Sequence, residues 1–383
     1  MAPQGFEMSR FATENDGVDG PAQTASSAKA AAAFRAATGG PSMDKLGRIG
    51  VDLGKGYFQV HCLPLEGGPA MNRKLSRAKM RAFFAGIAPC RVGMEACGSA
   101  HYWARELVAM GHEVVLMPPA YIKPYVKRGK NDAADAAAIC EAMSRPDMRF
   151  VPVKSADQQA ALMLHKTREL LVKQRTMSVN ALRSHLAELG LVVAKGIGRV
   201  DELSALAEND ASLPQEAREA AKLLALHIEA LTRSIDAMER KIAKACASNK
   251  TSRLLDRVPG VGPLTASAIA ASVPDPGVFK SGRDFAAWLG LTPRQNSSGG
   301  KAKLGAVTKK GNRYIRKLLV VGATAVLRFA GKRRGPLADS IAALRARKPE
   351  RLVAVALANK LARICWAIMT TGELFREQAF AKA

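Results

Sequence analysis

Residues 48–64 read RIGVDLGKGYFQVHCLP, and this stretch decides the fold of the first part of the chain. RIGVDLG and YFQVHCLP are short apolar segments separated by turn residues, which is typical of two β-strands. A third such segment, AMNRKLS, follows at 70–76. The first structured part of the chain is therefore predicted to begin with three successive strands.

Beyond these strands, helices and strands are predicted to alternate. We expect a helix at 77–87, a strand at 91–96 (RVGMEA), a helix near 99–110 and a strand at 112–119 (HEVVLMPP). A helix then begins near Asn131 (KNDAADAAAICEAM), and the strand-like segment RFVPVK at 149–154 closes the domain. This is the element order of the ribonuclease-H-like fold, so residues 44–155 are predicted to form an α/β domain with a mixed sheet and helices on its faces.

Residues 156–250 are predicted to be mostly helical. Apolar residues alternate spacings of four and three over three heptads, which indicates the a/d seam of a coiled coil. The seam consists of Leu224, Ile228, Leu231, Ile235, Met238, Ile242 and Ala245, and an earlier helix repeats the rhythm at Val179, Leu182, Leu186 and Leu189. The two helices could pair as an antiparallel hairpin, or part of the seam could face another protomer.

The C-terminal part, residues 251–383, is predicted to be mostly α-helical. Its last helix carries Leu357, Leu361, Ile364 and Ile368 on one face, which we expect in the core. LLDRVPGVGPLTASAIAASV at 254–273 is typical of a helix-hairpin-helix. In that motif Gly260 and Gly262 would let backbone N–H groups approach a DNA phosphate at a helix N-terminus; a plain glycine-containing helical turn is the alternative.

Basic residues dominate the chain, with 58 Lys and Arg against 33 Asp and Glu and a net charge of +25. No acidic residue occurs from Phe285 to Ala338. So large a surplus favours a polyanionic partner, because phosphate neutralisation releases counterions. We expect nucleic acid in preference to a membrane surface.

The remaining totals indicate a cytoplasmic protein. The six cysteines are scattered without CxxC or zinc-like spacing, as expected for buried thiols in a reducing compartment. No apolar run approaches the roughly 18 residues of a membrane span. Residues 1–43 are rich in small residues, lack the apolar core of a signal peptide and are expected to be disordered, and Met43 could be the true start.

Four carboxylates occupy suggestive positions. Asp52 ends the first predicted strand and Glu95 the fourth, and these two strands are expected to be neighbours. Asp132 and Asp135 are three residues apart, so they project from one face of a helix. Four converging carboxylates repel one another unless a divalent cation neutralises them, and oxygen ligands alone suit Mg²⁺ or Mn²⁺. Each acid taken singly could instead cap a helix or a turn.

Ser297 and Ser298 lie in the loop NSSGGK at 296–301. Basic residues that could contact phosphate follow this loop: Lys301, Lys303, Lys309, Lys310, Arg313 and Arg316, with Lys317 beside them. A serine hydroxyl attacks phosphorus only when a group helps to remove its proton and another stabilises the developing negative charge. No acid or histidine nearby could take the proton, so a reacting serine would need metal from the carboxylate domain. A phosphate-binding turn without covalent chemistry is the alternative.

Several segments together resemble the DEDD-type insertion-sequence transposases related to the Piv invertase, a family that includes bridge-RNA-guided recombinases. The segments are IGVDLGK at 49–55, MEACGSAHYWA at 94–104, KNDAADA at 130–136, PGVGPLTA at 259–266, FAAWLGLTPRQNSSGGK at 285–301 and TKKGNRYIRKLL at 308–319. The resemblance covers about residues 46–370. Only the N-terminal tail of about 40 residues departs from the family pattern.

The resemblance implies a specific activity. Asp52, Glu95, Asp132 and Asp135 would bind Mg²⁺, and the C-terminal transposase domain would supply a serine nucleophile, which falls on Ser298, with Ser297 left open. It also implies a noncoding guide RNA that pairs with donor and target DNA, and 5′-phosphoserine links. It further implies a tetramer (a dimer of dimers) in which protomers share active sites. The expected location is the nucleoid, in a prokaryotic cytoplasm.

Three other functions fit parts of the sequence. IGVDLGKGYFQV also resembles the first phosphate loop of actin-like sugar kinases and ATPases, but the second Asp-Gly motif and the adenosine-binding glycine pair of that class are missing. A RuvC-like Holliday-junction endonuclease would use water as its nucleophile. A non-catalytic nucleic-acid-binding protein would keep the acids for structure.

Overall fold

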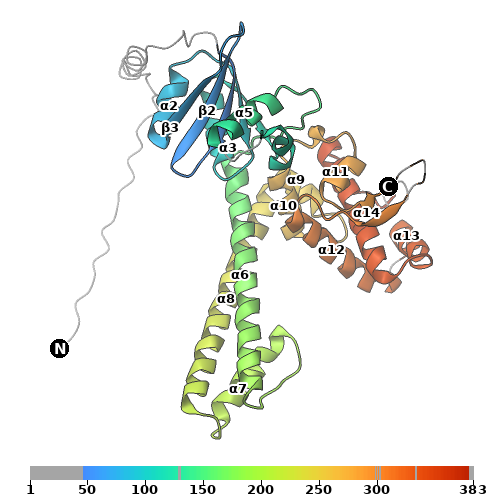
Figure 1. Cartoon of the computed structure of the whole chain (residues 1–383). Coiled ribbons are helices and arrows are strands. Elements are labelled where there is room, and N and C mark those ends of the chain that lie inside the picture. Colours follow the sequence, from blue (N-terminus) through green and yellow to red (C-terminus); the bar gives the residue numbers. More distant parts are fainter. Residues whose placement is uncertain are drawn as a thin grey trace, which may run out of the picture. The chain divides into compact units, whose positions relative to one another are not determined.

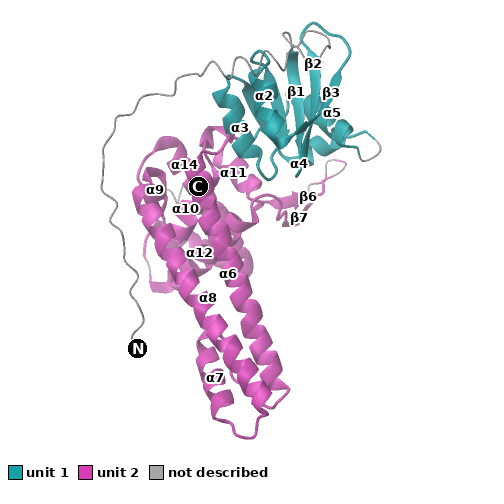
Figure 2. Cartoon of the chain, turned by 90° about the vertical axis from the view of Figure 1, so that its left-hand side faces the viewer, with its two compact units in different colours: residues 1–151 teal, residues 152–383 magenta. Residues whose placement is uncertain are grey.

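The structure is a computed structural model that describes residues 46–127, 131–297, 299, 301, 303–332 and 334–378. The chain divides into two compact units between Val151 and Pro152 (Figure 2). The predicted tail, residues 1–43, lies outside the described residues. The predicted division at residue 155 lies four residues beyond the boundary between the units.

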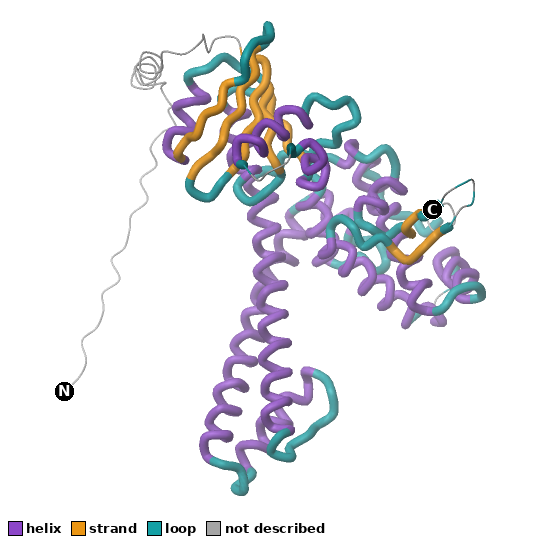
Figure 3. The backbone as a smooth tube through the Cα atoms, viewed as in Figure 1, coloured by secondary structure: helices purple, strands orange, loops and turns teal. Residues whose placement is uncertain are grey.

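The first unit contains a five-stranded mixed sheet in the order β3-β2-β1-β4-β5 (Figures 1 and 3). β1 pairs antiparallel with β2 and parallel with β4, so the first and fourth strands are neighbours as predicted. β2 pairs antiparallel with β3, and β4 pairs parallel with β5. The strands are β1 (Leu46–Leu53), β2 (Tyr57–Pro64), β3 (Met71–Ser76), β4 (Arg91–Glu95) and β5 (Glu113–Met117).

Helices cover the sheet because its side chains alternate between two buried faces. Phe58 in β2 is fully buried and meets the ring of Trp103 from α3 edge-on at 5.3 Å. Leu63, of opposite parity in the same strand, packs instead with residues of α5. The helices of this unit are α2 (Arg77–Ala85), α3 (Ala100–Ala109), α4 (Pro119–Ile122) and α5 (Asp132–Ala142), with a 3-10 helix at Lys123–Tyr125.

The predicted strand at 149–154 is wrong. Only an isolated antiparallel bridge joins Val151 to Leu116 of β5. Pro152 has no N–H to donate to a ladder, and a proline commonly ends strand pairing. The sheet therefore ends at β5, and this segment leaves the first unit.

Two long helices open the second unit, α6 (Ala156–Ala187) and α8 (Gln215–Ser248), and they lie side by side in Figures 1 and 2. Ser155 and Gln158 form a capping box at the start of α6. Val179 and Leu186 of α6 share one core with Ile228 of α8 and with α7 (Val200–Asn209). Most of the two apolar stripes therefore packs within one chain, but Leu189 lies beyond the end of α6 and is 40% exposed, so its place in the stripe was wrong. Supercoiling stays a prediction.

The rest of the second unit is a helical domain around one apolar core. Leu357, Leu361, Ile364 and Ile368 are buried, as predicted. Contrary to the expectation that no apolar run reaches the length of a membrane span, α14 is long and apolar enough to cross a membrane by length and composition. Half of its apolar window is buried in this core. The helices are α9 (Lys250–Leu255), α10 (Pro263–Ser272), α11 (Gly282–Trp288), α12 (Arg313–Arg328), α13 (Pro336–Arg345) and α14 (Glu350–Thr371).

A buried histidine ties α6 to this domain. His165 is 2% exposed, with Nδ1 3.2 Å from the Tyr314 hydroxyl of α12 and Nε2 3.1 Å from the Ser267 hydroxyl of α10. Burial lowers the pKa of His165 to about 4, so the neutral ring is the form that fits. Lys317 of α12 also pairs with Glu169 of α6 at 2.6 Å.

A two-stranded hairpin of β6 (Pro293–Gln295) and β7 (Leu304–Val307) interrupts the helices of the C-terminal part. The sequence analysis did not predict it. All three residues of β6 and three of the four in β7 are exposed, so no buried face leaves an alternating apolar pattern. The hairpin carries the NSSGGK segment between its strands.

Candidate functional site

Asp52 stands near the carboxyl end of β1, on the sheet face that α5 covers. Side chains two residues apart share a face, and Gly50 lies directly under α5. A Cβ atom on Gly50 would lie 2.2 Å from the Ala136 carbonyl oxygen and 2.7 Å from the Cys140 amide nitrogen. Only a residue without a side chain lets α5 approach the sheet this closely.

The N-terminus of α5 is fixed by a cap. The Asn131 side chain accepts a hydrogen bond from the Ala133 amide at 3.0 Å, which starts the helix at Asp132. Asp132 and Asp135 both lie in the first turn. Because Asp132 is one turn before Ala136, the contact at Gly50 brings this turn over the end of β1.

Three of the four predicted carboxylates come together. Single carboxylate oxygens of Asp52, Asp132 and Asp135 all lie within 4.8 Å of one another. Asp52 and Asp135 are half-buried, and Asp132 is exposed. An all-oxygen set of this size suits a hard divalent cation.

Glu95 is not in that close group, but it ends the neighbouring strand. Val51 pairs with Met94 in the parallel ladder, so Asp52 and Glu95 are the next residues of the two strands. Burial raises the pKa of Glu95, and the charges of Asp52 and Asp135 raise it further. The fourth carboxylate therefore faces the same negative field.

Asp52 experiences the same repulsion. Burial raises its pKa, the charges of Asp135 and Asp132 add to the effect, and a hydrogen bond with the Leu53 backbone opposes it. A raised pKa means that the folded chain disfavours the ionised carboxylate. A bound cation would relieve this repulsion, and perturbed carboxylates of this kind cluster at functional sites.

Gly50→Ala tests the close approach of α5. We expect the substitution to lower the stability of the first unit by roughly 1–3 kcal/mol, because the new methyl group meets backbone atoms that cannot rotate away. Thermal unfolding measures the change. Gly56→Ala is the matched control, since a Cβ there meets nothing within 4 Å. Equal melting temperatures for the two variants would contradict this account.

The serine loop joins β6 to β7. The Ser297 hydroxyl accepts hydrogen bonds from the Lys303 backbone N–H at 3.2 Å and the Gln295 side-chain amide at 3.3 Å. The Asn296 N–H donates to the Lys303 carbonyl at 2.8 Å and extends the hairpin. Ser297 thus has a structural role at the base of the loop, while Ser298 lies outside the described residues.

The predicted phosphate-binding residues fall into two groups. Lys301, Lys303, Lys309, Lys310 and Arg313 are exposed, as phosphate contacts require. Arg316 is half-buried and donates to the Leu289 carbonyl at 2.7 Å and the Lys310 carbonyl at 3.1 Å. Arg316 therefore holds the loop before α12 against the end of α11, and its phosphate contact stays a prediction.

The two glycines of the PGVG segment also differ. Gly260 has φ +84°, and a Cβ on it would lie 2.9 Å from Cγ2 of Val326 and 3.0 Å from the Gly322 carbonyl oxygen, both in α12. Packing against α12 therefore explains a glycine at 260. Gly262 is exposed at the N-cap of α10, with open space around it, so it remains the better candidate for a phosphate contact. The helix-hairpin-helix function stays a prediction.

Sequence reasoning missed the residues that position these groups. Gly50 was considered only as part of a strand, although a glycine inside a strand often marks a close backbone approach. Arg316 was treated like its basic neighbours. Its spacing of three residues from Arg313 places both side chains near one another on α12, so the sequence offered no signal that separates the two.

Comparison with known proteins finds two family matches along the chain. Residues 49–190 match the DEDD transposase domain of the IS110 group, and residues 252–336 match the transposase IS116/IS110/IS902 family. The first match covers the whole carboxylate site, and the second covers the serine loop with α10 to α12.

Full-length relatives are similar along most of the chain. A putative transposase of Sinorhizobium fredii is 48% identical over 88% of this chain and 88% of its own length. A probable family 20 transposase of Pseudomonas aeruginosa is 46% identical over 86% of this chain and 99% of its own. The transposase for insertion sequence element IS1111A of Coxiella burnetii is 38% identical over 88% and 93%. The chain belongs to the IS116/IS110/IS902 family of transposases, which act on DNA.

Proposed function

We propose that this transposase cleaves and rejoins DNA strands through the hydroxyl of Ser298, with a divalent cation held by Asp52, Asp132, Asp135 and Glu95. The convergence of three carboxylates from β1 and α5 within 4.8 Å is the observation that carries the proposal. Burial raises the pKa of Asp52, and the charges of Asp135 and Asp132 raise it further, as expected for crowded carboxylates that a cation would neutralise.

The residues fit Mg²⁺ or Mn²⁺, because all the candidate ligand atoms are carboxylate oxygens. A divalent ion at such a site stabilises the charge that develops on phosphate oxygens during phosphoryl transfer. The chain's own part is to hold the four acids: Gly50 sets the depth of α5, and Asn131 starts the helix at the right residue.

The strand transfer begins with attack of a hydroxyl nucleophile on a DNA phosphodiester. The Ser298 oxygen forms a bond to phosphorus, the bond from phosphorus to the 3′ oxygen breaks, and the serine proton ends on that leaving 3′ oxygen. A 5′-phosphoserine link results. Reversal by a different 3′ hydroxyl rejoins the strand and frees the serine.

Ser298 is favoured over Ser297 by the hydrogen bonds of the hairpin. The Ser297 oxygen already accepts from Lys303 and Gln295 at the base of the loop. A hydroxyl oxygen that accepts two hydrogen bonds has little lone-pair density left for attack. Gly299, with φ +55°, turns the backbone directly after Ser298.

The exposed basic residues around the serine loop would bind DNA phosphates. We expect a double variant, Lys310→Ala with Arg313→Ala, to reduce the slope of log affinity against log salt by roughly two units, since each phosphate contact contributes about 0.9. Fluorescence anisotropy over a salt series measures the slope. Lys244→Ala, exposed on α8, is the control and should leave the slope unchanged. An unchanged slope in the double variant would place DNA on another surface.

We also propose a noncoding guide RNA as a partner, a tetramer built as a dimer of dimers, and action at the nucleoid of a prokaryotic cytoplasm. The resemblance of the motifs supports these points, and the net charge of +25 supports binding to a polyanion such as RNA. Sequencing of RNA that copurifies with the chain, and its mass in solution, test them.

A Holliday-junction endonuclease that uses water is the second candidate. It is favoured by the position of the close carboxylate group, which lies entirely within the RuvC-like first unit. A denaturing gel distinguishes the two functions. The serine recombinase leaves protein covalently joined to cleaved DNA, whereas the endonuclease leaves free 5′ phosphates and no joined protein.

A further inference from the structure

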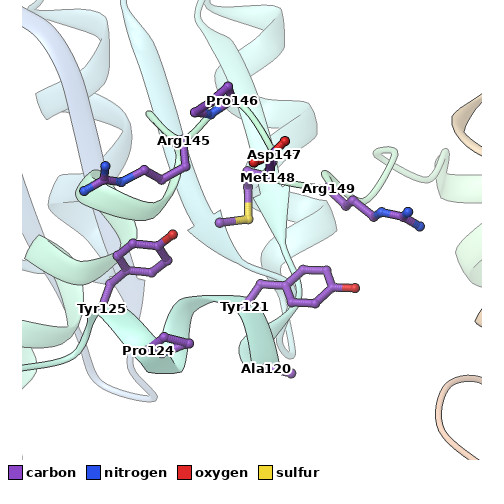
Figure 4. Close-up of a pocket in the computed structure, with 9 residues that line it drawn as sticks. All are labelled: Ala120, Tyr121, Pro124, Tyr125, Arg145, Pro146, Asp147, Met148 and Arg149. Atoms are coloured by element: carbon purple, nitrogen blue, oxygen red, sulfur yellow. The ribbon is translucent and has the colours of Figure 1, made fainter. Parts of the chain in front are cut away.

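A cavity of about 620 Å³ opens on the first unit, near the C-terminal end of α5. Its walls come from α4, the 3-10 helix that follows, and the loop at 145–149. Figure 4 shows the rings of Tyr121 and Tyr125 on two sides of the cavity, with Met148 between them. The volume is within the range of small-molecule sites.

Tyr125 is held in place before any ligand arrives. It packs beside α5 in the apolar cluster that contains Ile139 and Met143. The Arg145 guanidinium lies over its ring at 5.6 Å from the centroid, and Glu141 forms an ion pair with Arg145. The aromatic wall is therefore rigid, which lowers the entropy lost on binding.

Tyr121 is the opposite case. Its side chain is 45% exposed, a large apolar area for a residue beside a cavity. An aromatic ring in this position gains most when a flat apolar group covers it. The flat groups available to a transposase are the bases of its nucleic acid.

Charge around the cavity fits the same ligand. Lys123 and Lys127 are exposed on the segment that carries the two tyrosines, and Arg149 ends the opposite loop. Basic side chains beside aromatic rings are the combination that binds single-stranded nucleic acid, because cations hold the phosphates while bases stack. Asp147, on the rim, can accept a hydrogen bond from an exocyclic amine of a base.

We propose that this cavity binds an unpaired nucleobase, stacked on Tyr121 and bounded by the fixed ring of Tyr125, from the nucleic acid on which the transposase acts. The inference rests on the proposed function only in that the chain must engage a strand. The 11 residues of α5 span about 15 Å, so a base here lies about four to five base-pair rises from Asp132. The cavity would fix the position of a strand relative to the carboxylates.

The test is anisotropy of the full chain with labelled 12-nucleotide strands in EDTA, where no cleavage occurs. Tyr121→Ala is expected to weaken binding of a homothymidine strand about 10-fold. On an otherwise identical abasic strand the variant and the wild type should bind equally, because the stacking partner is missing. Tyr121→Phe should bind both strands like the wild type, since stacking needs the ring and not the hydroxyl.

Tyr102→Ala on α3 is the matched control, because Tyr102 is exposed to a similar extent, 42%, and does not line the cavity. The same measurement with a homouridine strand distinguishes DNA from RNA. The strand whose affinity falls more in Tyr121→Ala identifies the occupant, and either outcome supports the site. A change under twofold in Tyr121→Ala, or a Tyr121→Phe variant as weak as Tyr121→Ala, would overturn the proposal. Cleavage is absent from every arm, so a failure of the serine chemistry would not alter this result.

Discussion

Asp52→Asn is expected to abolish DNA strand cleavage while leaving nucleic-acid affinity within about twofold. Asp52 belongs to the group of carboxylates within 4.8 Å, and loss of a direct ligand should exceed the roughly 10- to 100-fold effect of losing an outer partner of a metal site. The amide keeps the shape of the side chain but removes its charge. Cleavage of a labelled donor strand over a range of Mg²⁺ concentrations measures the loss.

The same variant has a stability signature. Because the pKa of Asp52 is raised, its ionised carboxylate destabilises the fold at neutral pH, and the neutral amide removes that repulsion. The melting temperature of Asp52→Asn in EDTA should therefore be no lower than that of the wild type. Glu113→Gln, at the start of β5, is a control that should still cleave. Cleavage by Asp52→Asn at the wild-type rate, or wild-type activity in EDTA, would refute the metal site.

Ser298→Ala is expected to eliminate the covalent protein–DNA adduct and strand exchange. Ser297, whose hydroxyl is described, already accepts hydrogen bonds from Lys303 and Gln295. Gel analysis of cleaved, 3′-labelled DNA under denaturing conditions measures the adduct, because the fragment joined to serine through its 5′ phosphate keeps the labelled 3′ end. Mixing Ser298→Ala with Asp52→Asn restores activity if serine and carboxylates come from different protomers, and leaves it absent if one chain supplies both.

Ser297→Ala is the matched control for the nucleophile. It removes hydrogen bonds worth about 1 kcal/mol each and should loosen the hairpin, but the adduct should still form. An adduct that persists in Ser298→Ala and disappears in Ser297→Ala would move the nucleophile by one residue. A wild type that cleaves without any adduct would establish water as the nucleophile.

The sheet could be predicted from sequence because its strands are buried and evenly punctuated. RIGVDLG, YFQVHCLP and RVGMEA each carry enough β-branched and apolar residues to define a strand, and their order fixes β1 and β4 as neighbours. The hairpin of β6 and β7 could not be found in this way, since exposed strands leave no periodic apolar signal. RFVPVK had that signal and still formed only a bridge, because tertiary context outweighs propensity.

The site shows the same contrast. The strand order placed Asp52 and Glu95 together, and helical spacing placed Asp132 beside Asp135. The distance between these two pairs depends on Gly50, because the absence of a side chain there lets α5 approach β1. No local sequence pattern indicates that approach. Arg316 shows the limit for basic residues, because composition alone cannot separate a cation that faces solvent from one that holds two carbonyls.

The contact between His165 and the helices α10 and α12 has a mechanical consequence. From His165 to the last residue of α6, Ala187, the helix extends about 33 Å. A tilt of about 5° at this anchor displaces the far end by about 3 Å, at a rise of 1.5 Å per residue. The anchor lies beside Tyr314, the second residue of α12, so a small tilt of α6 at this contact is amplified at the far end of the helix.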